Sequence, residues 1–474
     1  QVFIGSSAGV TREQLDQIQF FDGTSTYYAV QLGTGEVVPG ANTSTSPTGK
    51  SNVQVTTLPT AGGSWSGLVS GTYTFTPSAD NANINVSDIQ NRLLGSGFTR
   101  GNVRIVTTST TGTQVGNVNI AAAITASNTT STAYTFTVDA SGDINVSSAI
   151  NLAASTVFNT SNRASMSVVL TALGTISISS PITTNASDNN NTTGIGPAGS
   201  ISLTASGNIF TSNTGTLNAI GGYSTFNGEG RGGAISLSAS SISLRGSISN
   251  GGVYSNTSAT TGNIAISTTN TATTAGVNDG QVSGLLRGGD FVKSGVGVFV
   301  IKGSNGYTGS TSVSGGVLRL GSSNSIPTGS ALSVAGTLDM GGYNQTVRTL
   351  SGGGLVTSSG SGTLVLMVSD NGEVTTYSGV IENGSASSVG LTKSGSGTLL
   401  LSGSSSYTGP TLISQGVLDV GHSNGLGLSS QTTVSSGAIL QLRGGISVGS
   451  LSLRLTGTGV SGAGALRNMS GNNS

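Results

Sequence analysis

Short runs in which apolar and polar residues alternate, separated by Gly, Asn and Ser, recur along the chain from about residue 100 onward. Their period of two residues is that of a β-strand with one buried face, and the runs are too short to be helices. Seven of these runs follow a glycine. Because apolar and polar residues alternate in them, the apolar members of each run should point toward a common core. These expected inward pairs are Val103 and Ile105, Val118 and Ile120, Ile144 and Val146, Ile176 and Ile178, Ile201 and Leu203, Ile235 and Leu237, and Ile264 and Ile266.

The spacing of these runs predicts a repeating fold. Most of the glycines that open successive runs lie about 15 to 32 residues apart, which brackets one three-strand turn of a solenoid. Because a single turn cannot bury its own inner face, the turns must stack, and the aliphatic pairs then form ladders along the axis. We therefore predict an all-β protein, a right-handed parallel β-helix with one or two short capping helices. About 22 to 25 residues per turn would give a rod of about 90 Å.

Two segments break the strand pattern and are predicted to be helices. Residues 11–14 and 87–90 each have the Ser/Thr-x-x-Glu/Gln spacing of a capping box, followed by apolar residues on one face. The first helix is expected over about residues 11–20, with strands in the rest of residues 1–40. Residues 41–52, rich in Thr, Ser, Asn and Pro, are predicted to be a linker.

Composition narrows the class of protein. Only 7% of the residues are charged, and 17 Lys and Arg balance 17 Asp and Glu, so the chain lacks the basic surface that nucleic acids or anionic membranes require. The 34% of hydrophobic residues is too high for a disordered tract. Cys is absent, which excludes disulfides and thiolate metal sites. No apolar run reaches the roughly 18 residues of a spanning helix, so we expect no membrane insertion by this segment.

A direct repeat is the strongest feature of the sequence. Residues 291–321 align without gaps on residues 391–421, at a constant offset of 100 positions. The shared glycines are expected at turn corners, where a positive φ or a close approach of two backbones is needed. The positions that we assign to the framework of the repeat are Lys293, Gly295, Gly297, Gly303, Tyr307, Thr308, Gly309, Gly316, Gly321, Lys393, Gly395, Gly397, Gly403, Tyr407, Thr408, Gly409, Gly416 and Gly421.

The second copy, from Lys393 to Gly421, closely resembles the autotransporter passenger-associated strand repeat (PATR). The first copy resembles it too, but has Val298 and Phe299 where Thr-Leu is usual. What the resemblance implies is a parallel β-helix in a large bacterial surface or secreted protein, commonly an adhesin, biofilm component or passenger domain, without catalytic residues. It covers roughly residues 285–474. Residues 53–284 more loosely resemble the irregular coils of filamentous-haemagglutinin-like adhesins.

The two ends of the chain resemble parts of neighbouring units. Residues 1–40 resemble the segment that ends such passenger units, and residues 464–474 resemble the beginning of a further turn. Two hypotheses follow. Either the chain is a slice or processed piece of a longer tandem protein, or the ends of neighbouring copies complete one another. An open solenoid end exposes an unpaired strand edge and favours head-to-tail self-association.

Candidate catalytic groups are few. Glycoside hydrolases need two carboxylates close together, but no Asp or Glu pair has i, i+2 spacing within an expected strand. Asp370 and Glu373 bracket the turn signal Asn371-Gly372 and are expected to be solvated. The single His422 is expected at an exposed corner, without a catalytic partner. We therefore expect no catalytic residue, no metal and no cofactor.

Aromatic residues are the remaining candidates for a binding surface. Tyr307 and Tyr407 precede Thr-Gly at a corner, which favours packing over a role as glycan platforms. Trp65, Tyr73 and Phe75 are expected to form the core of a cap. The sequence thus predicts an extracellular structural or adhesive β-helix of a bacterial surface, fibre or biofilm matrix. The alternative is a glycan-binding adhesin stalk or autotransporter passenger, with surface glycans as partners, and a polysaccharide-degrading enzyme is less favoured.

Overall fold

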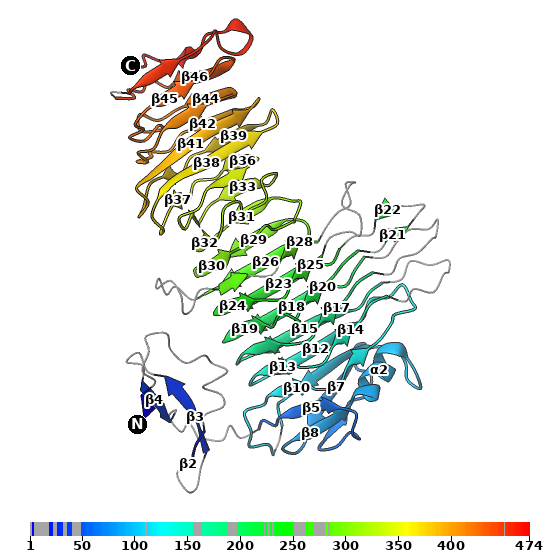
Figure 1. Ribbon diagram of the computed structural model, residues 1–474. Coiled ribbons are helices and arrows are strands. Elements are labelled where there is room, and N and C mark those ends of the chain that lie inside the picture. Colours follow the sequence, from blue (N-terminus) through cyan, green and yellow to red (C-terminus); the bar gives the residue numbers. More distant parts are fainter. Residues whose placement is uncertain are drawn as a thin grey trace.

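The chain winds into a three-sided parallel β-helix, with a wider lower stack and a narrower upper stack (Figure 1). The computed structural model describes residues 49–109, 111–154, 164–186, 197–221, 232–250, 262–269, 285–449 and 451–474, and the backbone of seven short strands outside these ranges. Nearly all strand pairs are parallel, and the stacked strands lie on three faces, although some turns of the helix, or rungs, have loop residues in place of a strand on one face. The predicted all-β parallel β-helix is confirmed.

Face 1 consists of a 12-stranded sheet and, above it, a five-stranded sheet, joined by a parallel bridge between Gly352 and Tyr377. Its strands, from the bottom to the top, are β6 Gly63–Trp65, β7 Thr72–Pro77, β9 Asn102–Val106, β12 Thr135–Ala140, β15 Ser167–Ala172, β18 Ile201–Ala205, β23 Ile235–Ala239, β26 Ile264–Thr268, β29 Phe291–Ser294, β31 Thr311–Val313, β33 Ala331–Val334, β36 Thr349–Ser351, β39 Val374–Tyr377, β42 Thr398–Leu401, β44 Gly416–Val420, β46 Ala438–Arg443 and β48 Leu466–Ser470.

Face 2 is a single 13-stranded sheet. Its strands are β8 Ala82–Asn85, β5 Val53–Thr56, β10 Val118–Ile120, β13 Ile144–Val146, β16 Ile176–Ile178, β19 Asn208–Thr211, β24 Ser241–Leu244, β27 Gly280–Val282, β30 Val298–Ile301, β32 Val317–Leu320, β34 Thr337–Asp339, β37 Leu355–Thr357 and β40 Val380–Ile381.

Face 3 has two six-stranded sheets, one in each stack. Loop residues connect them, since Gly306 N donates to Leu286 O at 2.9 Å and the Gln345 side chain donates to Ile326 O at 2.8 Å. The strands are β11 Ile124–Thr125, β14 Ile150–Asn151, β17 Ile182–Thr183, β20 Leu217–Asn218, β25 Ile248–Ser249 and β28 Leu286–Arg287, then β35 Gln345–Val347, β38 Thr363–Asp370, β41 Ser388–Gly395, β43 Thr411–Ile413, β45 Thr432–Val434 and β47 Leu453–Leu455.

The remaining elements lie outside these faces. Two strands in the lower stack, β21 Tyr223–Ser224 and β22 Gly228–Glu229, pair with each other, and η1 Val460–Gly462 is a short 3-10 helix. Near the N-terminus, β1 Val2–Phe3, β2 Gln19–Phe21, β3 Thr26–Gln31 and β4 Glu36–Pro39 form an antiparallel sheet. No described helix is long and apolar enough to cross a membrane.

All seven predicted inward pairs lie in the core, where each side chain is at most 2% exposed. They stack in register, but on two faces and not one. Val118, Ile144 and Ile176 stack on face 2, whereas Ile201 and Ile264 belong to the ladder of face 1. The irregular spacing of the glycine-led runs arises because some successive runs occupy two faces of one rung.

Rung length distinguishes the two stacks. Ser167 and Ser200 occupy the same place on successive rungs of the lower stack, and this rung holds about 33 residues. Asp290 and Ser310 are equivalent in the upper stack, and that rung holds about 20 residues. The expectation of about 22 to 25 residues per turn is therefore wrong at both of these places, but it holds higher in the upper stack, where Val368 and Lys393 pair 25 residues apart. Because 17 strands stack on face 1, a spacing of about 4.8 Å gives an axial length of about 77 Å, below the expected length of about 90 Å.

A helix, α2 Val86–Leu94, closes the bottom of the lower stack. Its Ile89 and Leu93 are fully buried, and it contacts β8, β9 and β11. The predicted helix is confirmed, but its N-cap is Asn85 and not Ser87, because the side-chain Oδ1 of Asn85 accepts from the Ser87 backbone N–H at 2.9 Å. Gly95, at φ 74°, ends the helix in the left-handed conformation.

The predicted N-terminal features are met only in part. Residues 19–21 form β2, so the helix expected over about residues 11–20 does not reach residue 20, and residues 11–18 lie outside the described residues. The predicted linker, residues 41–52, ends earlier than expected. Gly49 N donates to Gly112 O at 2.9 Å, and Ser51 is buried with its N–H on Thr107 O, because the chain has already joined the stack there. Residues 41–48 lie outside the described residues.

The two predicted β-helix regions, residues 53–284 and 285–474, form one continuous stack. Across their boundary, β26 pairs with β29 on face 1 and β27 pairs with β30 on face 2. What changes near this boundary is the rung length. It falls from about 27 residues between Ile264 and Phe291 to about 20 residues between Phe291 and Thr311.

Candidate functional surfaces

The two copies of the repeat lie on different faces of the upper stack. In the first copy, Phe291 is in β29 on face 1 and Val298 is in β30 on face 2. In the second copy, Leu391 is in β41 on face 3 and Thr398 is in β42 on face 1. Between equivalent residues of the two copies, the chain thus passes through four full rungs and then two more faces. Because a rung has three faces, the second copy is rotated about the axis by one face relative to the first.

Both repeat lysines are fully buried at the corner that follows their strand. The Lys293 Nζ donates to the carbonyl oxygens of Ser294 at 2.5 Å, Gly295 at 3.1 Å and, one rung higher, Gly315 at 3.3 Å. The Lys393 Nζ makes the same three bonds in the second copy, at 3.1, 2.7 and 3.4 Å. Burial lowers the pKa of Lys293 to about 8. The lysine therefore satisfies corner carbonyls that the strand ladders leave free.

The second copy adds a counter-charge. Asp370 Oδ2 lies 2.6 Å from the Lys393 Nζ, and both side chains are almost fully buried. Asp370 Oδ1 also accepts the backbone N–H groups of Gly372, at 3.1 Å, and Gly397. The turn at Asn371-Gly372 is present, but the expectation that Asp370 is solvated is wrong, because the strand above covers it. In the first copy, Gly297 N donates instead to a backbone oxygen, that of Thr268, at 2.7 Å.

The repeat tyrosines pack inside their corners. Tyr307 is 2% exposed and Tyr407 is fully buried, so neither offers a ring to a glycan, and the expected packing role is confirmed. Each hydroxyl bonds the Oγ1 of the threonine four residues later, at 2.7 Å for Tyr307 and 2.8 Å for Tyr407. The neighbouring threonines bond the rung below. The backbone N–H and the hydroxyl of Thr308 both donate to Gly288 O, and the backbone N–H of Thr408 donates to the Asn383 side chain.

The repeat glycines serve two geometric needs. A positive φ, between 61° and 83°, is found at Gly295, Gly303, Gly316, Gly395 and Gly416. A Cβ would come within 2.5 Å of a neighbouring oxygen atom at Gly309, Gly397, Gly403 and Gly409. At Gly321 a Cβ would lie 2.4 Å from the flexible Lys302 side chain, and at Gly421 nothing is nearer than 3.4 Å. The structure gives no steric reason for glycine at position 421.

The cap holds an aromatic cluster around an arginine. Phe75 and Tyr73 are buried, and Trp65 packs edge-on against Phe75 with 5.4 Å between ring centroids. The Arg92 guanidinium of α2 lies 4.2 Å from the Trp65 centroid and 4.4 Å from that of Phe98. The expected cap core is confirmed. Sequence reasoning missed Arg92, although its position three residues after Ile89 places it on the buried side of the short helix.

No catalytic constellation is assembled among the described residues. His422 is half-buried, and its Nδ1 accepts the Asn424 backbone N–H at 3.0 Å, which is a turn contact. The described part of the chain holds no group of three or more His, Cys, Asp or Glu side chains suited to a metal ion. The other buried acids pair with arginine, as Asp339 does with Arg319 at 2.7 Å. These carboxylates support the stack.

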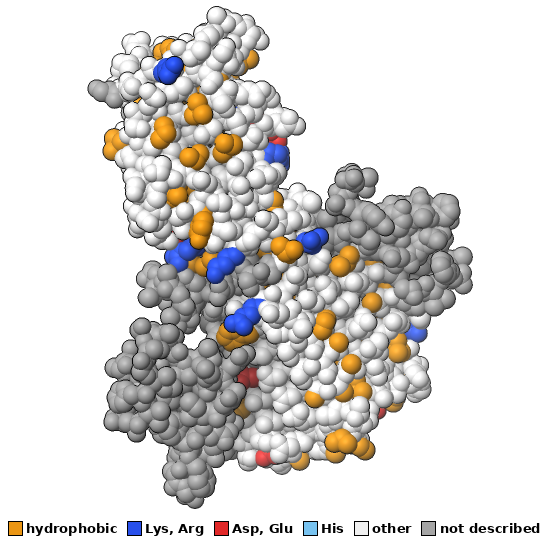
Figure 2. All heavy atoms as spheres, viewed as in Figure 1, with side chains coloured by type: hydrophobic (Ala, Val, Ile, Leu, Met, Phe, Trp, Pro, Cys, Tyr) orange, Lys and Arg blue, Asp and Glu red, His pale blue; other side chains and the backbone are white. Residues whose placement is uncertain are grey.

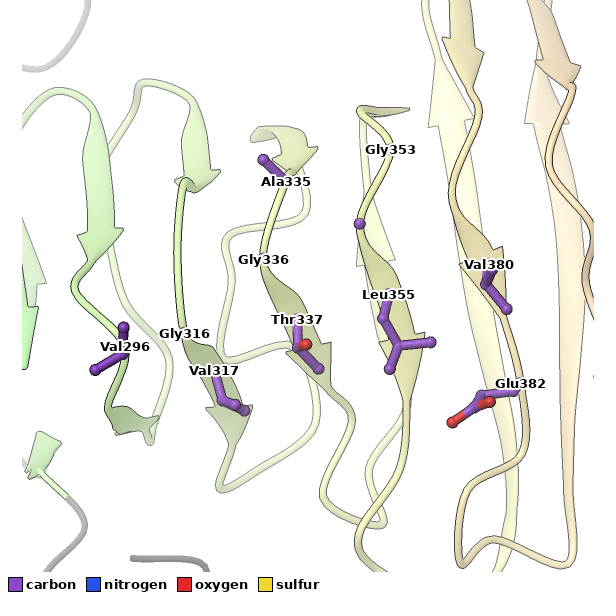
Figure 3. Close-up of a pocket in the computed structure, with 11 residues that line it drawn as sticks. Val296, Gly316, Val317, Ala335, Gly336, Thr337, Gly353, Leu355, Val380 and Glu382 are labelled. Atoms are coloured by element: carbon purple, nitrogen blue, oxygen red, sulfur yellow. The ribbon is translucent and has the colours of Figure 1, made fainter. Parts of the chain in front are cut away.

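A shallow furrow of about 720 Å³ runs across five rungs beside the corner between faces 1 and 2. Figure 3 shows its side chains as a row, one from each rung, with Glu382 at one end. The row consists of Val296, Val317, Thr337, Leu355 and Val380. The remaining lining residues are glycines and Ala335, and Glu382 is the single charged group of the furrow.

The exposed surface is poor in charge. In the view of Figure 2, Lys, Arg, Asp and Glu are sparse, and most of the surface is uncharged polar side chains and backbone. The exposed part of the molecule therefore offers hydroxyl and amide groups more than ionic contacts.

Comparisons with known proteins bear on this architecture. A family model described as the passenger-associated-transport-repeat matches residues 291–320 and 391–420. The Adhesin BmaC autotransporter of Brucella suis biovar 1 (strain 1330) is 39% identical to this chain over 209 residues, which cover 41% of this chain and 6% of the adhesin. The chain thus spans a small part of that relative's length, and no solved structure matches it. This protein therefore carries two passenger-associated-transport repeats, both built into the upper stack of one parallel β-helix.

Proposed function

We propose that the chain is a segment of an extracellular or surface protein of a bacterium, and that its role is adhesive or structural and not catalytic. The observation that carries this proposal is the pair of passenger-associated-transport repeats within one unbroken stack. The similarity to an autotransporter adhesin supports it. Aliphatic ladders and continuous strand pairing make a stiff rod, which suits a protein that presents surfaces away from a cell.

Surface display tests this proposal. The 474-residue segment would be displayed on a non-adherent bacterium, and attachment to cell monolayers and to surfaces coated with matrix proteins would be counted. We expect a several-fold gain that an excess of the purified segment competes away. The absence of any gain, together with the absence of bacterial clumping, would refute the proposal. Turnover of any neutral or acidic glycan by the purified segment would instead establish an enzyme.

End-to-end association is part of the proposal. On the last rung, Leu453 and Leu455 stack on buried positions of β45 but are 37% and 45% exposed. A further rung would cover them, whether from a longer chain or from a neighbouring copy. At the other end, α2 covers the stack, so an added rung fits only the end formed by β47 and β48. Length measurement by electron microscopy tests this, since end-to-end joining gives rods of twice the single length.

A linear, uncharged surface glycan is a second candidate ligand, and the furrow favours it. The side chains that line the furrow repeat once per rung, at a spacing of about 4.8 Å, which is close to the length of one sugar ring. Their apolar surfaces suit the C–H faces of sugars. Leu355→Asp should weaken binding of a neutral linear glycan at least tenfold, whereas Val374→Asp, at a position that is 77% exposed outside the furrow, should leave it unchanged. Equal effects of both variants would remove the furrow from consideration.

A further inference from the structure

The outer surface of face 1 is made of small, uncharged side chains over seven successive strands, from β15 to β33. All seven strands lie within the described ranges, and their outward positions are half-buried or exposed. We call this surface the hydroxyl face. It consists of Ser167, Val169, Thr171, Ser202, Thr204, Ser236, Ser238, Ala265, Ser267, Val292, Ser294, Ser312, Ala331 and Ser333.

The rows of the hydroxyl face are regular. One row passes from Val169 through Ser202, Ser236 and Ala265 to Val292 without a shift in register. Every side chain in it is small, so a partner can approach the backbone closely along the whole row. Regular rows of small side chains on opposing sheets can interdigitate and exclude water.

The face has nothing that would keep a second sheet from packing on it. Charged side chains and prolines oppose such face-to-face packing, and neither occurs at the outward positions of the seven described strands. Ion pairs flank the face instead. Arg104 and Asp139, with 2.6 Å between nitrogen and oxygen, lie below it, and Arg348 and Glu373 lie above it.

We propose that the hydroxyl face binds the hydroxyl face of a second copy of this chain, side by side. A second copy has the same axial repeat, so its rows can match these rows over many rungs, which a partner with another repeat cannot do. Ser and Thr can bond one another across the contact, as cross-strand hydroxyl pairs do. The uncharged surface and the net charge of +0 impose no repulsion between copies.

The size of the face sets the strength of this contact. Seven strands spaced about 4.8 Å apart and about 17 Å long offer roughly 550 Å² per copy, or about 1,100 Å² in total. A specific interface needs about 1,000 Å². The pairing should therefore be weak in dilute solution and should become significant where many copies are held close together on one surface.

Cysteine crosslinking tests the contact directly, because the chain contains no cysteine. Ala265→Cys places a thiol on the middle strand of the face, and Ser243→Cys places one at an outward, half-buried position on face 2. Under mild oxidation of the full chain at high concentration, we expect the Ala265→Cys variant to form disulfide-linked dimers at least tenfold faster. Equal rates for the two variants, or no dimer from either, would overturn the proposal.

Charge repulsion gives a second, independent measurement. Ser236→Lys combined with Val292→Lys puts two charges on the face, two rungs apart, and Ser177→Lys combined with Ser243→Lys does the same on face 2. Sedimentation of the full chain should show concentration-dependent dimers that only the first pair abolishes, with circular dichroism confirming that both variants fold. Dimers that persist in the first variant would contradict the proposal. Because no receptor is involved, failure of the adhesion assay would leave this result unaffected.

Discussion

The two copies of the repeat place the same lysine among the same three carbonyl oxygens, but only one of them has a carboxylate beside it. Lys393 contacts Asp370 at 2.6 Å, whereas the three bonds recorded for the Lys293 Nζ all go to backbone oxygens. The bonds to the corner carbonyls are therefore the shared role of the lysine. The acid is an addition that comes from the strand below, outside the repeat itself.

This difference also shows what the rotation of the copies by one face changes. Each copy supplies its own strands and corners, but the rung beneath it comes from unrelated sequence. β38 carries Asp370 to the corner below Lys393, while β26 ends with Thr268 at the corresponding place below Lys293. Equivalent residues in the two copies therefore have the same backbone arrangement around them but different neighbouring charges.

The largest expected effect on stability comes from removing the Lys393 ammonium. Lys393→Met leaves the Asp370 carboxylate buried without its counter-ion, which should cost about 3–5 kcal/mol. Lys293→Met removes an ammonium that has no buried acid to leave behind, and should cost at most about 2 kcal/mol. Hydrogen exchange measured in denaturant, on peptides covering β41 and β42 or β29 and β30, would give each local stability.

The double variant Asp370→Asn with Lys393→Met is the control for this prediction. Because it removes both buried charges, it should recover most of the stability that Lys393→Met loses. Equal losses for Lys293→Met and Lys393→Met, or no recovery in the double variant, would show that the ion pair does not distinguish the copies.

The pH dependence of stability should also separate the two lysines. Burial lowers the pKa of Lys293 from its ordinary value to about 8, so between pH 8 and about 10 the unfolded chain holds a proton that the folded chain has lost. Stability should therefore rise with pH in this window, and the rise should vanish in Lys293→Met. The pKa of Lys393 is lowered by burial too, but Asp370 acts to raise it, so its contribution to the slope should be smaller.

Tyrosine ionisation limits the upper end of this window. Burial raises the pKa of Tyr307, Tyr377 and Tyr407 in the folded chain, so above about pH 10 the unfolded chain loses their protons first and stability falls. Comparing the wild-type chain with Lys293→Met at each pH cancels this common effect. A difference between them that stays constant from pH 7.5 to 10 would contradict the assignment of the slope to Lys293.

The strands and the core could be predicted because they depend on local pattern. A period of two residues identifies inward pairs such as Ile144 and Val146 without knowledge of their neighbours, and both are buried. The assignment of strands to faces could not be predicted in this way. In the lower stack, the number of residues between the face 3 strand and the next face 1 strand varies, from 9 between β11 and β12 to 17 between β17 and β18. The distance along the chain between glycine-led runs therefore does not reveal whether two runs share a face.

The repeat framework shows the same limit. The constant offset between the copies identified the lysines, glycines and tyrosines, but the partner of Lys393 lies before the second copy begins and is set by the register of β38 on β41. Asp370 next to Asn371-Gly372 has the sequence of an exposed turn, and only the rung above it makes it buried. At α2, Asn85 and Ser87 are both good capping residues, and the bond from Ser87 N to Asn85 decides between them.

The smallest expected effect concerns the buried tyrosine hydroxyls, which again differ between the copies. Thr311 Oγ1 bonds Tyr307 and also the Ser330 hydroxyl, at 2.8 Å, so it keeps a partner when the tyrosine hydroxyl is removed. Thr411 Oγ1 bonds only Tyr407 among the described contacts. Tyr307→Phe should therefore cost about 0.5–1.5 kcal/mol, while Tyr407→Phe should cost about 1–3 kcal/mol because a buried hydroxyl loses its partner.

A second substitution makes this difference specific to the hydroxyl network. Ser330→Ala combined with Tyr307→Phe removes both partners of Thr311, so the first copy should then lose about as much stability as Tyr407→Phe alone. Local hydrogen exchange of β31 and β43 gives the two values in each variant. If Tyr307→Phe already costs as much as Tyr407→Phe, the bond between Thr311 and Ser330 contributes nothing, and the copies are equivalent at this corner.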